Sequence, residues 1–180
     1  MENNWGICIC GLNGSGKTTL GSVLAKKLDF YHVDVENYYF SSDDIAYTSP
    51  RDRETVKAEI LSDIRTHGHF VLTAVKGDMG AEIVSHYRMV VVLQAPQDIR
   101  TERVARRSQE RFGARMLPGG DLYEKESRFL RFVAERTEAP IEAWLSTLSC
   151  PILRLCGTDP PEQNAAAMIA YMSKTEKPTR

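Results

Sequence analysis

The 180-residue sequence has no long apolar run and no surplus of charge of either sign. No segment approaches the ~20 consecutive apolar residues that a membrane-crossing helix needs, so we expect no membrane association. The apolar run after Met1 is too short to be a signal peptide. Lysine and arginine (23) nearly balance aspartate and glutamate (24), which gives no global reason to expect nucleic-acid binding. These absences predict a globular, cytoplasmic protein.

The sequence also has few cysteines, and their spacing matches no metal or redox motif. The four are Cys8, Cys10, Cys150 and Cys156. No pair is separated by two residues, and no histidine lies close in sequence. We expect all four to be reduced thiols in the core, as is usual in a cytoplasmic protein.

The most informative stretch is 11–18, Gly-Leu-Asn-Gly-Ser-Gly-Lys-Thr, which lies between an apolar run and a helix-patterned run. Its glycines let the backbone turn with N–H groups pointing inward, and a helix N-terminus adds partial positive charge. Lys17 would reach the β- and γ-phosphates of a nucleotide, and the Thr18 hydroxyl would ligate Mg²⁺. The alternative, a glycine-rich turn with a surface lysine, needs a chance match expected in roughly one chain in a hundred. The expected nucleotide-binding residues are Gly11, Asn13, Gly14, Ser15, Gly16, Lys17, Thr18 and Thr19.

Predicted strands and helices alternate along the chain. The expected strands are 5–10, 30–33, 70–75, 89–93 and 151–155. This alternation predicts a three-layer α/β domain with a mainly parallel sheet, whose ligands collect at the carboxyl ends of the strands. Ser49 is the expected cap of a helix that starts near Pro50, and Asp121 is the expected cap of another, with Glu124 as its capping-box partner.

Two acidic residues, Asp34 and Glu36, follow the second predicted strand. A carboxylate opposite the phosphate loop could ligate Mg²⁺, directly or through water, or act as the base that orients an acceptor hydroxyl. The alternative is that Asp34 caps the turn or helix that follows. We expect Asp34 at the site in one of the first two roles; Glu36 is equally compatible with function and with a surface position.

Six arginines and only two acidic residues lie between positions 100 and 115. The six are Arg100, Arg103, Arg106, Arg107, Arg111 and Arg115. Four of them share one face of a helix, and arginine suits planar, bidentate phosphate recognition. We expect a mobile segment in which the arginines at 103, 107, 111 and 115 stabilise the transferred phosphoryl group and exclude water. The alternative is a solvated charged face paired with nearby acids.

These motifs resemble the small P-loop kinases, the group that contains adenylate, shikimate, gluconate and uridine kinases. Residues 11–18 match the phosphate loop of the group in full. Weaker matches are 32–36 to the aspartate-bearing segment, 93–96 with the following arginines to the strand-to-lid passage, and 155–158 to the loop that packs against adenine.

The resemblance implies a P-loop NTPase fold with five strands in the order 2-3-1-4-5. It implies one domain over 1–175, with an acceptor-binding insertion at about 35–66, a lid at about 107–122 and a frayed tail at 176–180. Gly157 would lie beside the nucleotide base. Arg51 and Arg53 become candidates for contacting an acceptor phosphate, unless they are surface residues.

One departure from the group concerns the acidic residue expected after the third strand. That strand runs into Val75-Lys76-Gly77, and Asp78 is displaced into the loop. Asp34 would therefore carry more of the magnesium work, together with Thr18.

The function that we expect is transfer of the γ-phosphoryl group of Mg-ATP to a small-molecule acceptor, such as a nucleoside, a nucleotide or a similar metabolite. The catalytic residues would be Lys17, Asp34 and the four arginines. The alternative is a nucleotide-binding ATPase or switch protein without an acceptor. A GTPase would need a guanine-reading Asn-Lys-x-Asp segment, which the sequence lacks.

Overall fold

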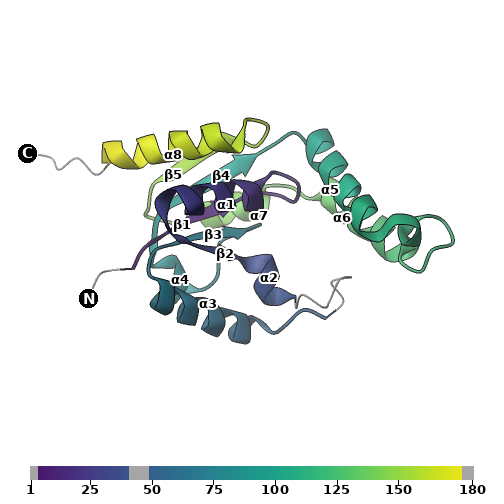
Figure 1. Cartoon of the computed structure of the whole chain (residues 1–180), viewed down its shortest axis with the longest axis horizontal. Coiled ribbons are helices and arrows are strands. Elements are labelled where there is room, and N and C mark those ends of the chain that lie inside the picture. The colour runs from purple at the N-terminus through teal and green to yellow at the C-terminus, as the bar shows by residue number, and fades with distance from the viewer. Residues whose placement is uncertain (1–3, 41–48, 176–180) are drawn as a thin grey trace, which may run out of the picture.

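The computed structural model describes residues 4–40 and 49–175. Its centre is a five-stranded sheet in the order β2-β3-β1-β4-β5, parallel throughout (Figure 1). The strands are β1 (Gly6–Cys10), β2 (Tyr31–Asp34), β3 (Phe70–Ala74), β4 (Tyr87–Gln94) and β5 (Ile152–Cys156). The expected fold class and strand order are confirmed.

Helices cover both faces of the sheet. They are α1 (Lys17–Leu28), α2 (Val35–Tyr39), α3 (Arg53–His67), α4 (Ala81–Val84), α5 (Gln97–Phe112), the 3₁₀ turn η1 (Gly113–Met116), α6 (Tyr123–Glu135), α7 (Ala139–Leu145) and α8 (Pro161–Thr175). None of the helices in the described ranges has the length and apolar character needed to cross a membrane. The predicted tail at 176–180 lies outside the described residues.

Alternation along the strands builds two separate cores. In β1, Ile7 and Ile9 pack with residues of α1 and α8, whereas Cys8 and Cys10 pack with residues of α3, α4 and α7. A strand points successive side chains to opposite faces, so a buried parallel strand must be apolar at every position. All five residues of β1 are buried, which holds the loop after β1 on a rigid base.

Helices α5 and α6 form a hairpin that extends beyond the end of the sheet (Figure 1). The base of the hairpin is anchored, because Gln97 Nε2 donates to the Ala134 carbonyl (2.9 Å) and Gln94 Nε2 donates to the Glu138 carboxylate (2.6 Å). The hairpin therefore has a fixed base beside the sheet and a distal end at η1. We call this α5–η1–α6 hairpin the lid, a name that covers residues 97–135.

Both predicted helix caps are wrong. Helix α3 starts at Arg53, and its cap is Asp52, whose carboxylate accepts from the Thr55 backbone N–H (2.9 Å). Helix α6 starts at Tyr123 with no side-chain cap. The Asp121 carboxylate instead accepts from the Arg115 guanidinium (2.6 Å). This ion pair occupies the carboxylate that would otherwise cap the helix.

The cysteines divide between core and surface. Cys8 and Cys10 are fully buried, as expected, and burial raises the pKa of the Cys10 thiol to about 12. Cys150 is only partly buried and Cys156 is exposed, so the expectation of four core cysteines is wrong. All four are free thiols.

Candidate active site

The turn between β1 and α1 is shaped by glycines that other side chains could not replace. Gly14 has a φ of 81°, and a Cβ atom there would lie 2.3 Å from the Arg100 carbonyl oxygen. Gly16, with a φ of 99°, is the N-cap residue of α1. Gly11 does not line the cleft; a Cβ there would lie 2.3 Å from the Leu93 carbonyl oxygen, so its role is close packing behind the loop.

The loop has the donors that a phosphate group requires. The Ser15 hydroxyl is buried and has no hydrogen-bond partner in the part of the chain that the structure describes, although buried polar groups almost always have one. Lys17 Nζ donates to the Leu12 carbonyl (3.0 Å), which curls the side chain back over its own loop. An orphaned hydroxyl, a flexible ammonium and a helix N-terminus together fit an anionic group of phosphate size.

The electrostatic state of Lys17 reflects its crowded position. Burial lowers the pKa of its ammonium to about 8, and the positive charge of Arg107 adds to this effect. Glu36 and Asp34 act in the opposite direction, because their carboxylates favour the charged ammonium. Lys17, the carboxylates of Asp34 and Glu36, and Arg107 come from three separate segments, and their charges interact across the same site.

Asp34 occupies the N-cap position of α2, but its side chain makes no capping hydrogen bond. The capping alternative is thus not what holds this carboxylate. Asp34 and Glu36 both line the cleft beside the phosphate loop. Their carboxylates have no hydrogen bond or ion pair within the described part of the chain.

The arginine stripe divides into two groups with different contacts. Arg100 is 5% exposed, and its Nη1 donates to the Asn13 carbonyl (3.3 Å). Arg103 Nη1 donates to the carbonyls of Gly14 (3.2 Å) and Gly157 (2.9 Å). These two guanidinium groups therefore hold the outer side of the phosphate loop.

Farther along α5, Arg107 and Arg111 line the cleft. The Arg111 guanidinium also lies 5.6 Å from the centre of the Phe112 ring. The structure does not bring Arg115 to the cleft, since its side chain is exposed and bound to Asp121. Arg106 lines the cleft and lies 3.9 Å from Glu110.

An arginine that the sequence did not indicate contacts the phosphate loop from the residue that directly follows the lid. Arg136, the C-cap residue of α6, donates from Nη1 to the Asn13 side-chain oxygen (2.8 Å). Burial and the nearby charge of Arg100 lower its pKa. No local pattern predicts this contact, because the partners are 123 residues apart.

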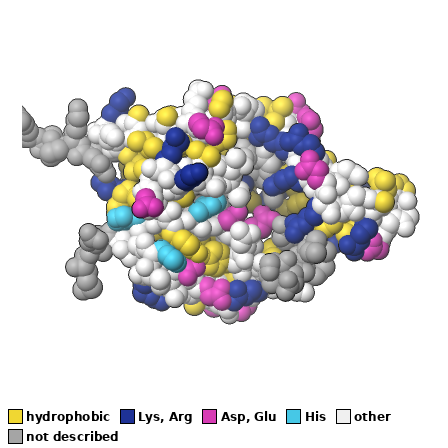
Figure 2. All heavy atoms as spheres, viewed as in Figure 1, with side chains coloured by type: hydrophobic (Ala, Val, Ile, Leu, Met, Phe, Trp, Pro, Cys, Tyr) yellow, Lys and Arg dark blue, Asp and Glu magenta, His cyan; other side chains and the backbone are white. Residues whose placement is uncertain are grey.

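The cleft has a volume of about 1190 Å³ and extends from the phosphate loop to the inner side of the lid. Basic and acidic side chains gather around a hollow on this face of the molecule (Figure 2). Thr18, Thr19 and Gly157, three of the residues expected at a nucleotide site, line this cleft. Gly157 also abuts the loop, because a Cβ there would lie 2.2 Å from the Ser15 carbonyl oxygen.

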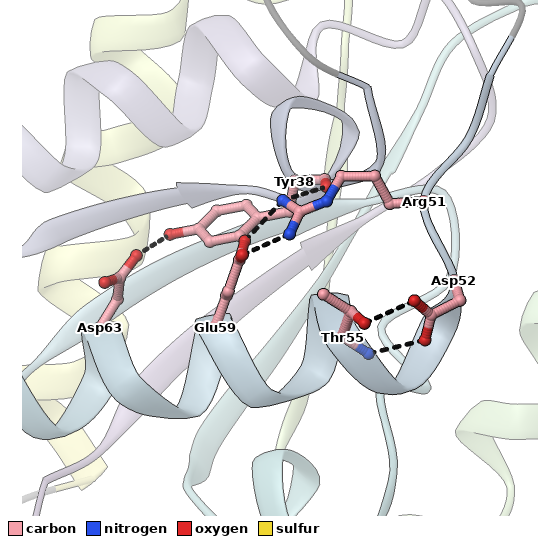
Figure 3. Close-up of polar contacts among 6 residues, drawn as sticks. All are labelled: Tyr38, Arg51, Asp52, Thr55, Glu59 and Asp63. Carbon is pink, nitrogen blue, oxygen red and sulfur yellow. Dashed lines mark hydrogen bonds and ion pairs between the residues drawn. The ribbon is translucent and has the colours of Figure 1, made fainter.

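On the other side of the cleft, the structure separates Arg51 from Arg53. Arg51 does not line the cleft, because its guanidinium binds the Glu59 carboxylate and the Tyr38 carbonyl (Figure 3). The Tyr38 hydroxyl donates to the Asp63 carboxylate (2.5 Å), which joins α2 to α3. Arg53 lines the cleft, with Nη2 donating to the Asp78 carbonyl (2.8 Å). Asp78 also lines it and pairs with Lys76 (3.0 Å).

Comparisons with known proteins agree with this geometry. A family model described as an AAA domain (AAA_18) matches residues 7–127. The uncharacterized protein YqaC of Bacillus subtilis (strain 168) is 30% identical over 181 residues, which cover 96% of this chain and 99% of YqaC. The chain belongs to this AAA domain family of P-loop NTPases.

Solved structures with a fold similar to that of this chain include small P-loop kinases. A putative kinase from Chloroflexus aurantiacus superposes with a TM-score of 0.60 at 16% identity, with 97% of each chain covered. Shikimate kinase from Acinetobacter baumannii superposes with a TM-score of 0.59 at 16% identity, over 98% of this chain and 97% of that one. At this identity the likeness establishes the fold.

The lowered pKa of Lys17 predicts that nucleotide binding takes up protons at alkaline pH. Phosphates beside the ammonium should return its pKa toward the ordinary value of about 10.4, so binding at pH 8.5 should take up roughly 0.7 of a proton. Titration calorimetry of a non-hydrolysable ATP analogue in buffers of different ionisation enthalpy measures this number. The dissociation constant should also rise, approaching tenfold per pH unit between about pH 8 and 10; a constant affinity over that range would contradict the prediction.

The Arg136–Asn13 contact predicts that the lid base supports nucleotide binding. Arg136→Ala should weaken binding of the ATP analogue about tenfold, the loss expected for one charge-assisted hydrogen bond. Asn13→Ala keeps the backbone N–H and should have a similar effect, and the double variant should be no weaker than either single one. Arg131→Ala, at an exposed position of α6, is the matched control. Additive effects of the two changes would refute the coupling.

Proposed function

We propose that the protein transfers the γ-phosphoryl group of Mg-ATP to a small-molecule acceptor. The observation that carries the proposal is the composition of the cleft, in which a phosphate loop faces carboxylates that have no partner in the described chain. Its volume of about 1190 Å³ exceeds the range typical of a site for one drug-sized ligand. A hydrolase that only releases phosphate would not need the part of the cleft that faces the phosphate loop and could hold an acceptor. The kinase folds of the superposed structures support the same reading.

The phosphate loop would hold the donor. Its inward N–H groups and the Ser15 hydroxyl would bind the phosphate oxygens, and Lys17 would leave the Leu12 carbonyl to reach the β- and γ-phosphates. When bound, Mg²⁺ would neutralise triphosphate charge. The Thr18 hydroxyl is exposed toward the cleft and would ligate it, with Asp34 as an additional ligand through water.

The acceptor would lie between α2, the loop after β3 and the lid. The Asp34 carboxylate would accept a hydrogen bond from the acceptor hydroxyl, which orients its oxygen toward the γ-phosphate. Arg107 lies in reach of the same region, since its charge acts on Lys17. It would neutralise charge on the transferring group, the main contribution that a protein makes to phosphoryl transfer.

The proposal predicts loss of transfer when Lys17 is replaced. Lys17→Ala should lower turnover at least about a hundredfold, because it removes a preorganised charge from the phosphates. Lys26→Ala, at an exposed position of the same helix, should leave turnover unchanged. A screen of nucleosides, nucleotides and sugar acids would measure ADP release, with the phosphorylated product identified by mass.

The same screen separates the proposal from its rival. Acceptor-dependent ADP release with a product heavier by one phosphoryl group supports a kinase. Lys17-dependent ADP release that no acceptor increases, with free phosphate as the product, would instead identify an ATPase or switch protein.

A further inference from the structure

One buried carboxylate in the cleft is not explained by the roles above. Glu126, in the first turn of α6, is 4% exposed, and its Oε2 atom has no hydrogen-bond partner among the described residues. No ion pair involves Glu126 in the described ranges 4–40 and 49–175. The sequence of 41–48, Ser-Ser-Asp-Asp-Ile-Ala-Tyr-Thr, contains no lysine, arginine or histidine. A buried carboxylate with no partner in the described part of the chain is costly, so this position favours a hydrogen-bond donor supplied from outside those residues.

The surroundings of Glu126 form a recess on the inner side of the lid. Its side chain lines the cleft together with Val104, Ser108 and Phe112 of α5 and Phe129 of α6. Val104, Ser108 and Phe112 are buried on the face of α5 that the hairpin covers. Apolar and aromatic walls around one or two polar groups are typical of a site for an organic ligand. We call these five residues the lid recess.

The lid recess lies near the catalytic end of the cleft. The Gln97–Ala134 hydrogen bond sets α6 antiparallel to α5 at the base of the lid. Equal steps of 1.5 Å per residue along both helices then bring Glu126 level with positions 104 to 108, a range that includes Arg107. Arg107 and Glu126 lie on the two arms of the same hairpin. A movement of the lid as a rigid unit would therefore leave the distance between these two side chains unchanged.

We propose that the lid recess binds the phosphoryl acceptor through an N–H group, with Glu126 as the hydrogen-bond acceptor. The ligand class is a neutral or cationic small molecule that carries an amino or ring N–H donor beside an apolar or aromatic face. The carboxylate pairs with the N–H donor, and Phe112 and Phe129 contact the apolar face. An anionic group in place of the donor is rejected, because it would meet a buried negative charge. The inference rests on the proposed kinase function and names the class of its acceptor.

The first test concerns stability and needs no acceptor. A buried side chain whose only partner is a ligand lowers the stability of the ligand-free protein. Glu126→Leu should therefore raise the melting temperature by about 2–6 °C. Glu124→Leu, in the same helical turn but exposed, is the control and should shift it by less than about 1 °C. A lowered melting temperature for Glu126→Leu would overturn the proposal, because Glu126 would then be part of the fold's own support.

The second test uses the acceptors themselves. Cytidine and adenosine, their 5′-monophosphates, D-glucosamine, D-gluconate and shikimate would be assayed with Mg-ATP by ADP release and product mass. Acceptors with an N–H donor and no anionic group should have kcat/KM values at least about tenfold above those of the sugar acids and the monophosphates. Glu126→Gln should raise the KM for such an acceptor about tenfold and leave the KM for ATP within about twofold.

The results separate this inference from the proposed function. Highest activity with gluconate, shikimate or a monophosphate would overturn the inference while the kinase function stands. An increase in the KM for ATP instead of the acceptor would assign the recess to the donor base and equally overturn it. If no compound is phosphorylated, the kinase proposal fails in this panel, and the stability test still decides whether Glu126 is kept for a ligand.

Discussion

The structure depends on the hydrogen bonding of the phosphate loop, whose Asn13 and Gly14 carbonyl oxygens face another segment of the chain. Those carbonyls then need donors on the outer side of the loop. Arg100 supplies one to Asn13, and Arg103 supplies one to Gly14 and also to Gly157. The buried β1 strand supports the loop from below. The loop is therefore enclosed by groups from three separate segments of the chain.

The arginines of α5 make two different kinds of contact around the phosphate loop. Arg100 and Arg103, near the start of the helix, bind loop carbonyls, and Arg103, Arg107 and Arg111 line the cleft at successive turns. The same helix thus shapes the anion site and carries cations toward it. Arg136 extends the arrangement to the far arm of the lid through Asn13. Residues at both ends of the hairpin therefore contact the phosphate loop.

The half of the cleft proposed to bind the acceptor differs in its chemistry from the half proposed to bind the nucleotide. Two of its cationic groups already have protein partners, since Arg53 donates to the Asp78 carbonyl and Lys76 pairs with the Asp78 carboxylate. Asp34 and Glu126, by contrast, have carboxylates without partners in the described chain. Unpaired acceptors facing a cleft are suited to a ligand that brings hydrogen-bond donors. This asymmetry supports the proposal that a nucleotide binds on one side and a molecule with hydrogen-bond donors on the other.

The sequence by itself determined the features that depend on neighbours along the chain. The glycine spacing of 11–18 and the apolar runs of the strands predicted the phosphate loop and the α/β class, and the family resemblance supplied the strand order. Side-chain partners were decided only by the tertiary structure. Arg115 was expected at the phosphates but binds Asp121, whereas Arg103 lines the cleft and also binds loop carbonyls. Arg136 and Glu126 had no local signal, because their surroundings come from segments far apart in sequence. Helical periodicity shows which residues share a face, but only packing shows what that face meets.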